Sequence, residues 1–223
     1  MGRPKLLNRE HVVDIALSEY WRNGIDNVGM AEIARLSGFD RAGIYKEFGG
    51  EEGLVNEVLE TYSTKYWLTR MPVMNAVSSP AMLVKLVYDA FINDNVMKNL
   101  ADYGVQDKTL KWPMPPKNVR GCCYFGLITS DTASGFKGSA KRKIKEITRF
   151  SHRYMREKFE QAERDGLLID GVSVDAANAF YEDQCLLMQL MRQRGFAKTK
   201  ITATRDFVLK SIFTQRALVA KLH

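Results

Sequence analysis

Apolar residues recur at helical spacing along most of this 223-residue chain. In the first such stretch, roughly residues 9–23, they form a broad face that predicts a helix packed against the rest of the chain. Asn8 stands where a capping side chain is expected, and Gly24 follows the last turn. The chain therefore begins with the pattern of a well-delimited amphipathic helix.

The segment 29–48, GMAEIARLSGFDRAGIYKEF, predicts two short helices joined by a tight turn. Ala34 allows the helices to approach closely, and Gly38 can adopt the positive φ that ends the first of them. Ile44 fills the angle between them, and Asp40 caps the second. Two interpretations of this pattern are open. It can belong to an ordinary helical hairpin or, more specifically, to a helix-turn-helix that reads DNA.

Further helical patterns cover about 51–70, 81–101, 139–165, 174–194 and 199–221, and another begins near Cys122. Pro72 and the turn at 78–80 are expected to end the first of these helices. The proline-rich segment 109–121 is too irregular for a core element and predicts a lid or a crossover. The predicted fold class is all-α, with a three-helix domain over residues 1–50 and a helical domain over 51–223, linked by the helix 51–70.

The net charge of +7 is unevenly distributed along the chain. Residues 1–60 hold seven Lys and Arg against eleven Asp and Glu, a balance of 7 − 11 = −4, so the basic charge lies in the rest of the chain. Support for DNA binding must therefore come from a few placed cations. The absence of a long apolar run, the lack of a signal-like N-terminus and only three cysteines predict a cytoplasmic protein without disulfides, zinc site or membrane span.

The first sixty residues resemble the TetR family of bacterial regulators, through VVDIALSEYWRNGI, EIARLSGFDRAGIYKEF and GGEEGLVNEVLE. The resemblance implies a phosphate contact for Tyr45 and groove-facing positions for Arg41, Ala42, Gly43 and Lys46, next to the cap Asp40. Arginine or lysine donating to guanine is the commonest specific contact. At position 51 the family commonly has a lysine where this chain has Glu51, and Gly29 replaces a capping Ser or Thr. We therefore expect few phosphate contacts and a shallow salt dependence.

The N-terminal segment Gly2-Arg3-Pro4-Lys5 is a short cationic arm. Arg3 and Lys5 are candidates for contacts along a groove or the phosphate backbone. A frayed, solubilising terminus explains the same residues equally well.

Candidates for an effector pocket are the aromatic residues of the larger domain and a neighbouring cysteine: Trp67, Phe91, Tyr103, Trp112, Cys122, Tyr124, Phe125, Phe150 and Tyr154. Cys122 follows a cation at a predicted helix start, which favours thiolate and makes it a candidate redox or electrophile sensor. A small residue packed inside a helix is the plainer alternative for Cys122.

Basic residues recur every four positions over 137–158, and they form either a solvated helix face or an anion site. The anion could be an acidic effector, a coenzyme-type phosphate or additional DNA. The last two predicted helices are the candidates for a homodimer interface, with Phe180, Tyr181, Leu187, Met188, Met191, Phe207, Val208 and Ile212.

These observations predict a homodimeric transcription regulator, a repressor, that binds a pseudo-palindromic operator and is released by a small-molecule or electrophile effector. Two alternatives stay open: a DNA-organising or partner-docking protein without an effector, and a helical enzyme. No cofactor, metal site or catalytic residue is expected, because neither a nucleophile pattern nor a glycine-rich phosphate loop is visible.

Overall fold

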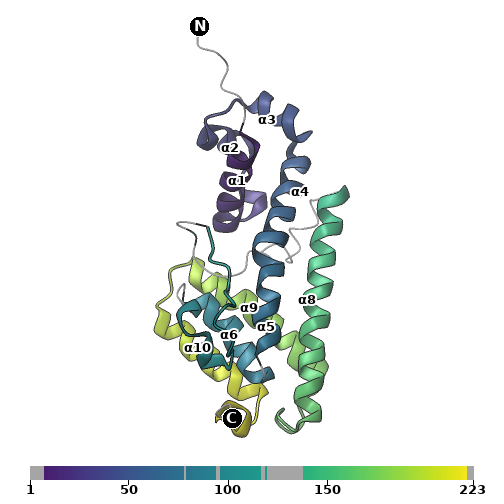
Figure 1. The fold of residues 1–223 in the computed structure, drawn as a ribbon, viewed down its shortest axis with the longest axis vertical. Coiled ribbons are helices and arrows are strands. Elements are labelled where there is room, and N and C mark those ends of the chain that lie inside the picture. The colour runs from purple at the N-terminus through teal and green to yellow at the C-terminus, as the bar shows by residue number, and fades with distance from the viewer. Residues whose placement is uncertain (1–7, 78, 94–95, 117–118, 120–137, 220–223) are drawn as a thin grey trace.

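The computed structural model describes residues 8–77, 79–93, 96–116, 119 and 138–219. Within these ranges the regular secondary structure is helical, joined by turns and irregular segments, with one isolated β-bridge between Leu168 and Phe213. Four short helices at one end of an elongated molecule form what we call the headpiece (Figure 1): α1 (Arg9–Asn23), η1 (Ile25–Asn27), α2 (Met30–Ser37) and α3 (Arg41–Phe48). The predicted all-α class is confirmed.

One long helical rod leaves the headpiece and enters the larger domain (Figure 1). It consists of α4 (Glu51–Tyr62), a π-helical turn η2 (Ser63–Trp67) and α5 (Leu68–Ala76). The expectation that Pro72 ends this helix is wrong, because Pro72 lies inside α5. Proline removes one backbone hydrogen bond, and here it follows a π-turn that has already altered the hydrogen-bond pattern.

The larger domain also contains α6 (Pro80–Ile92), η3 (Val96–Tyr103), α8 (Gly138–Arg164), α9 (Val174–Gln193), α10 (Lys198–Ile212) and α11 (Gln215–Val219). The helices predicted over 139–165 and 174–194 are confirmed to within one residue. The helix predicted over 81–101 is wrong, because α6 ends at Ile92 and a 3₁₀ segment kinked at Asn99 follows. The helix predicted from Cys122 lies outside the described residues.

The helix predicted over 199–221 is also divided into two. It stops at Ile212 because Phe213 adopts extended backbone and forms the bridge to Leu168. The next amide, Thr214 N–H, donates to the Leu167 carbonyl oxygen at 2.9 Å. Within the described ranges, no helix is both long and apolar enough to cross a membrane.

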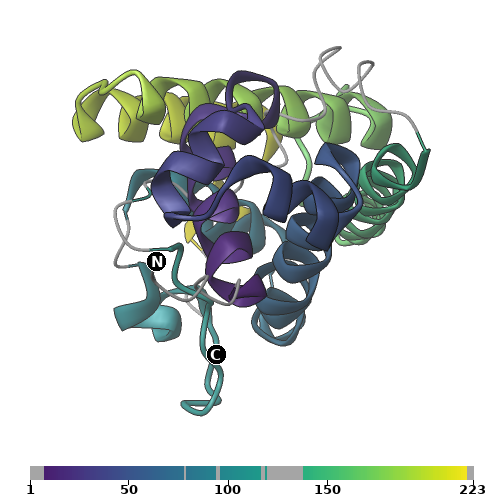
Figure 2. The ribbon, with the colours of Figure 1, turned by 90° about the horizontal axis from the view of Figure 1, so that it is seen from above.

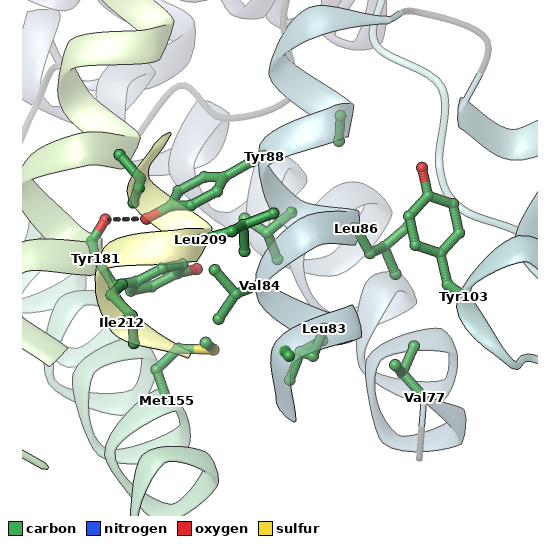
Figure 3. Close-up of a cluster of buried hydrophobic side chains, with 14 of the residues drawn as sticks. Val77, Leu83, Val84, Leu86, Tyr88, Tyr103, Met155, Tyr181, Leu209 and Ile212 are labelled. Atoms are coloured by element: carbon green, nitrogen blue, oxygen red, sulfur yellow. Dashed lines mark hydrogen bonds between the residues drawn. The ribbon is translucent and has the colours of Figure 1, made fainter. Parts of the chain in front are cut away.

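Two apolar cores lie one above the other, and α8 contributes to both. The headpiece core joins α1–α4 to the first half of α8, through Ala140, Ile144 and Ile147. The larger core joins α6, α9 and α10 to the second half of α8 (Figure 3). Seen from above, α8 stands beside α4 at the edge of the molecule (Figure 2).

Candidate nucleic-acid interface

The headpiece begins with a helix whose two ends are fixed by the predicted caps. The Asn8 side chain accepts a hydrogen bond from the His11 amide at 3.1 Å, and Gly24 ends α1 with a φ of 83°. Tyr20 and Trp21 are fully buried on the inner face of α1. This helix is the platform on which the next two helices pack.

The turn between α2 and α3 has the geometry that its sequence predicts. Gly38 adopts the left-handed conformation with a φ of 71°, and its amide closes α2 on the Ala34 carbonyl oxygen. The Asp40 carboxylate accepts the Gly43 amide at 2.7 Å, so this side chain acts as the N-cap of α3. The start of α3, and therefore the direction of its outer face, is fixed by these two residues.

α3 has a buried inner face and an exposed outer face. Ile44 and Phe48 are buried in the headpiece core, whereas Arg41, Ala42 and Lys46 are exposed. The outer side chains present two cationic donors around a small residue. A helix with this pattern can enter the major groove and donate to base edges.

Tyr45 supports Arg41 on the outer face of α3. The Arg41 guanidinium lies 5.2 Å from the Tyr45 ring centroid, and its Nη2 donates to the Tyr45 hydroxyl at 3.3 Å. This hydrogen bond raises the pKa of Arg41 above its ordinary value. Because Tyr45 is half-buried, it holds an otherwise flexible arginine near one orientation.

Two residues that sequence reasoning missed connect α3 to α4. A β-carbon at Gly53 would overlap with the Phe48 carbonyl oxygen, so only glycine allows the first turn of α4 to close against the end of α3. Arg9 of α1 holds the same corner, with ion pairs to Glu47 at 2.9 Å and Glu57 at 3.1 Å. The sequence signal that could have identified Gly53 was its position shortly after the adjacent glycines Gly49 and Gly50.

Residues 12–58 match the family described as bacterial regulatory proteins, tetR family. The match spans α1, α2, α3 and the first part of α4, which is the unit whose geometry is given above. The headpiece belongs to the TetR family. The matched family consists of regulators rather than enzymes.

Both a curated protein and solved structures are similar to this chain. The HTH-type transcriptional repressor ComR of Escherichia coli (strain K12) is 31% identical over 65 residues, which are 29% of this chain and 31% of ComR. The TetR-family regulator CifR, solved as a cysteine mutant with 26-bp double-strand operator DNA, has a TM-score of 0.65. It is 19% identical and covers 95% of this chain and 100% of its own.

A TetR-family regulator from Agrobacterium tumefaciens has a TM-score of 0.67 at 14% identity, over 92% of this chain and 97% of its own. At such identities the structural likeness establishes the fold of the larger domain, not its ligand. Of the predicted site residues, Arg3, Lys5, Cys122, Tyr124 and Phe125 lie outside the described residues.

The structure brings three of the predicted pocket residues together. Phe150 of α8 packs edge-on to Trp67, with ring centroids 6.3 Å apart, and stacks on Tyr154 at 6.4 Å. The other three lie elsewhere. Phe91 is buried in the larger core, and Tyr103 donates to the Asp89 carboxylate at 2.6 Å.

The remaining predicted pocket residue, Trp112, lies beside a buried cation that sequence reasoning missed. The Arg70 guanidinium is 5.3 Å from a Trp112 ring centroid and 5.9 Å from that of Tyr62. Arg70 sits where the rod passes from one core to the other. A cation inside the apolar face of a long helix was the available signal.

Asp89 is the centre of a polar cluster that sequence reasoning also missed. Only 5% of the residue is exposed, and its carboxylate accepts from Lys85, Tyr103 and Arg205. Burial alone would lower the pKa of Arg205, but its bonds to carboxylates raise it above its ordinary value. The cluster borders a cavity of about 250 Å³ between α6, η3 and α10.

The predicted dimer residues of the larger domain divide into two groups. The chain's own core buries five of them, namely Tyr181, Met188, Met191, Val208 and Ile212. These five side chains are taken up within one chain, which corrects the expectation that they are free to meet a partner. Phe180 is half-buried, Leu187 is 41% exposed and Phe207 is 70% exposed.

Proposed function

We propose that this protein is a transcription regulator that uses α3 to read an operator and represses the genes behind it. The observation that carries the proposal is the outer face of α3, where Arg41 and Lys46 stand exposed above the buried Ile44 and Phe48. The family match of the headpiece and the ComR similarity support DNA binding and transcriptional repression. CifR, a structure of the same fold, is described with double-strand operator DNA.

The proposed binding form is a homodimer through α9 and α10. Phe207 and Leu187 are large apolar side chains that one chain leaves exposed, and Phe180 is only partly covered. A second copy that covers these side chains would remove apolar surface from water. The two-fold symmetry would then offer two α3 helices to a pseudo-palindromic operator.

The proposed effector is a small molecule that binds within the larger domain. Trp67, Phe150 and Tyr154 form an aromatic group where the rod meets α8, next to the headpiece core. A ligand bound there would favour the dimer whose two α3 helices are wrongly spaced for successive major grooves. It can shift this equilibrium only by its different affinity for the two states.

In the test, the purified protein is titrated against the DNA that lies upstream of its own gene, and fluorescence anisotropy measures the binding. Tyr45→Phe and Lys46→Ala are compared with wild type, and Lys108→Ala removes an exposed cation of the larger domain as the matched control. We expect both α3 variants to lose affinity for the operator while the control retains it. Losing one specific contact costs about 1–3 kcal/mol, or roughly 5- to 150-fold.

The proposed function would be rejected if wild type bound operator and random duplexes with equal affinity at low salt. Selection from random sequences would also have to yield no preferred duplex. The dimer is tested in the same preparation by sedimentation. Phe207→Glu should shift the protein toward monomer, whereas Gln215→Glu, on the exposed part of α11, should not.

A further inference from the structure

A row of exposed cations runs along the side of α8 that faces away from α4. Arg142, Lys145, Arg149 and Arg153 are separated by three or four residues, so they share one helix face. All four are exposed, whereas Ala140, Ile144 and Ile147 are buried on the opposite face. We call these four residues the basic ridge.

The basic ridge is not neutralised by neighbouring carboxylates within the described part of the chain, where none of its four members forms an ion pair. Residues 138–153 contain six Lys and Arg and one Glu, a balance of 6 − 1 = +5. Like charges on adjacent turns repel one another, so the ridge lowers helix stability unless an anion offsets it. The ridge is therefore a surface that attracts anions.

The start of α8 is fastened to the start of α4. The Glu52 carboxylate accepts the Ser139 amide at 3.2 Å, and the Asn56 side chain donates to the Ser139 hydroxyl. One turn further along, Lys143 pairs with Glu60 at 2.6 Å. α4 itself follows directly after α3, so these contacts hold the start of α8 against the helix that leaves the headpiece (Figures 1 and 2).

The headpiece has few cations to offer to a polyanion. Arg9, Arg22 and Arg35 each pair with a carboxylate of the headpiece or of α4. Residues 1–60 carry a net charge of 7 − 11 = −4. DNA binding depends strongly on phosphate neutralisation, so a protein with this headpiece needs cations from another element.

We propose that Arg142 and Lys145, at the headpiece end of the basic ridge, bind the phosphate backbone of DNA that flanks the bases read by α3. This inference rests on the proposed function, because α3 brings the duplex to this end of the molecule. The contact is electrostatic and independent of base sequence. It supplies affinity that the acidic headpiece lacks, and it leaves operator choice to α3.

The contribution of the ridge falls with distance from the headpiece. α8 runs away from α3 (Figure 1), and Arg153 lies 11 residues beyond Arg142, which is roughly 16 Å along the helix axis. Arg149 and Arg153 therefore stay outside the reach of a duplex docked on α3. Two pairs of cations on one helix face thus serve as test and matched control.

The experiment measures the affinity of the full-length protein for double-stranded DNA over a salt series. Arg142→Gln/Lys145→Gln is compared with Arg149→Gln/Arg153→Gln, which removes the same charge from the far part of the ridge. Each phosphate contact contributes about 0.9 to the slope of log affinity against log salt. We expect the first variant to lower the slope by about 2 and the second to leave it at the wild-type value.

Base preference supplies a second readout. The near-end variant, Arg142→Gln/Lys145→Gln, should lose affinity equally for operator and random duplexes, because phosphate contacts carry no sequence information. Lys46→Ala should instead lose affinity mainly for the operator. Circular dichroism should match wild type for both ridge variants, and their unfolding midpoints should not fall, since these side chains are exposed and repel one another.

The inference would be overturned if wild type and the near-end variant had equal salt slopes. It would also be overturned if both ridge variants lost the same amount of slope, because that result indicates a diffuse effect of charge rather than contact. An acidic protein partner for the ridge would also leave the DNA slope unchanged. Failure of the proposed function has a different signature. In that case wild type shows no operator preference, and the slope on random duplex still decides whether Arg142 and Lys145 meet phosphate.

Discussion

Each α-helix of the headpiece ends at a neighbouring glycine, whereas α10 of the larger domain ends where residues distant in the chain meet. Gly24, Gly38 and Gly49 all adopt positive φ directly after α1, α2 and α3. In the larger domain, α10 ends because Phe213 pairs with Leu168, about 45 residues earlier. The α-helices of the headpiece are thus all ended by local signals, whereas the end of α10 is set by a tertiary contact.

The ion pairs of the two regions differ in burial. Arg35 pairs with Glu32 on the exposed surface of a single helix. The Asp89 carboxylate of the larger core instead joins α6 to η3 and, through Arg205, to α10. Exposed pairs within a helix contribute little stability, whereas a buried carboxylate that loses its partners is costly.

Asp89→Ala should have the largest effect on this contrast. It leaves Arg205 and Lys85 without the carboxylate that they share, at a cost of about 3–5 kcal/mol of unfolding free energy. Chemical denaturation measures the change. The control is Asp102→Ala, an exposed carboxylate of the same cavity, which should stay within about 0.5 kcal/mol of wild type. A similar loss in both variants would show that long-range polar contacts are not what holds this domain.

Alkaline pH should weaken the folded state through its buried tyrosines. Burial raises the pKa of Tyr20 in the headpiece and of Tyr88 and Tyr154 in the larger domain, to about 12 for Tyr154. Unfolded tyrosines ionise near pH 10, so the folded state holds these protons more tightly. Stability is fully retained below pH 10 and falls above it, by about 1.4 kcal/mol per pH unit for each such tyrosine.

The measurement is denaturant unfolding at several pH values, alongside absorbance of phenolate. Tyr154→Phe should reduce the pH slope above pH 10, because one of the raised phenols is gone. A Tyr154→Phe protein with an unchanged slope would show that Tyr154 ionises normally in the folded state.

Gly53→Ala should damage the junction of α3 and α4. The added methyl group must displace the Phe48 carbonyl oxygen, and such overpacking costs about 1–3 kcal/mol. Because the shift moves the end of α3, operator affinity should fall together with the unfolding midpoint. For the unfolding midpoint alone, Gly43→Ala is the control for an added methyl group within α3, where the nearest atom belongs to the side chain of Asp40. Comparable behaviour of the two variants would argue against close backbone contact at Gly53.

Gly38→Ala should have the smallest effect, about 1–2 kcal/mol, because alanine is strained at a φ of 71°. Gly29 has ordinary extended backbone with a φ of −82° and open space around it, so Gly29→Ser should instead stabilise α2 by a few tenths of a kcal/mol. Thermal unfolding of the two variants compares the backbone conformation that requires glycine at position 38 with the side-chain cap that is missing at position 29. Loss of stability at position 29 would refute this assignment.

The sequence predicts the headpiece well because its signals are local. Asn8 and Asp40 accept the hydrogen bonds that N-caps are expected to accept, and Gly38 makes the expected turn. The helix over 81–101 failed because apolar spacing continues past Ile92 although the backbone does not. Periodicity reports which residues are apolar, and cannot report where a distant segment stops a helix.

The candidate site likewise has one part that the sequence predicts and one part that it does not. The exposure of Arg41 and Lys46 follows from helical periodicity once Ile44 and Phe48 are assigned to the core. The partner of Glu52 does not, because Ser139 lies 87 residues further along the chain. Glu52, the acidic neighbour of Glu51 in the first turn of α4, thus serves as an attachment point for α8.

The position of α8 also has a consequence for autonomous folding. Its first half completes the apolar core that α1–α4 begin, through Ala140, Ile144 and Ile147. A fragment ending at residue 62 would leave the surface of α4 that these side chains cover open to water. The excised DNA reader is therefore expected to unfold at lower denaturant and to be cleaved by proteases faster than the same helices in the intact chain.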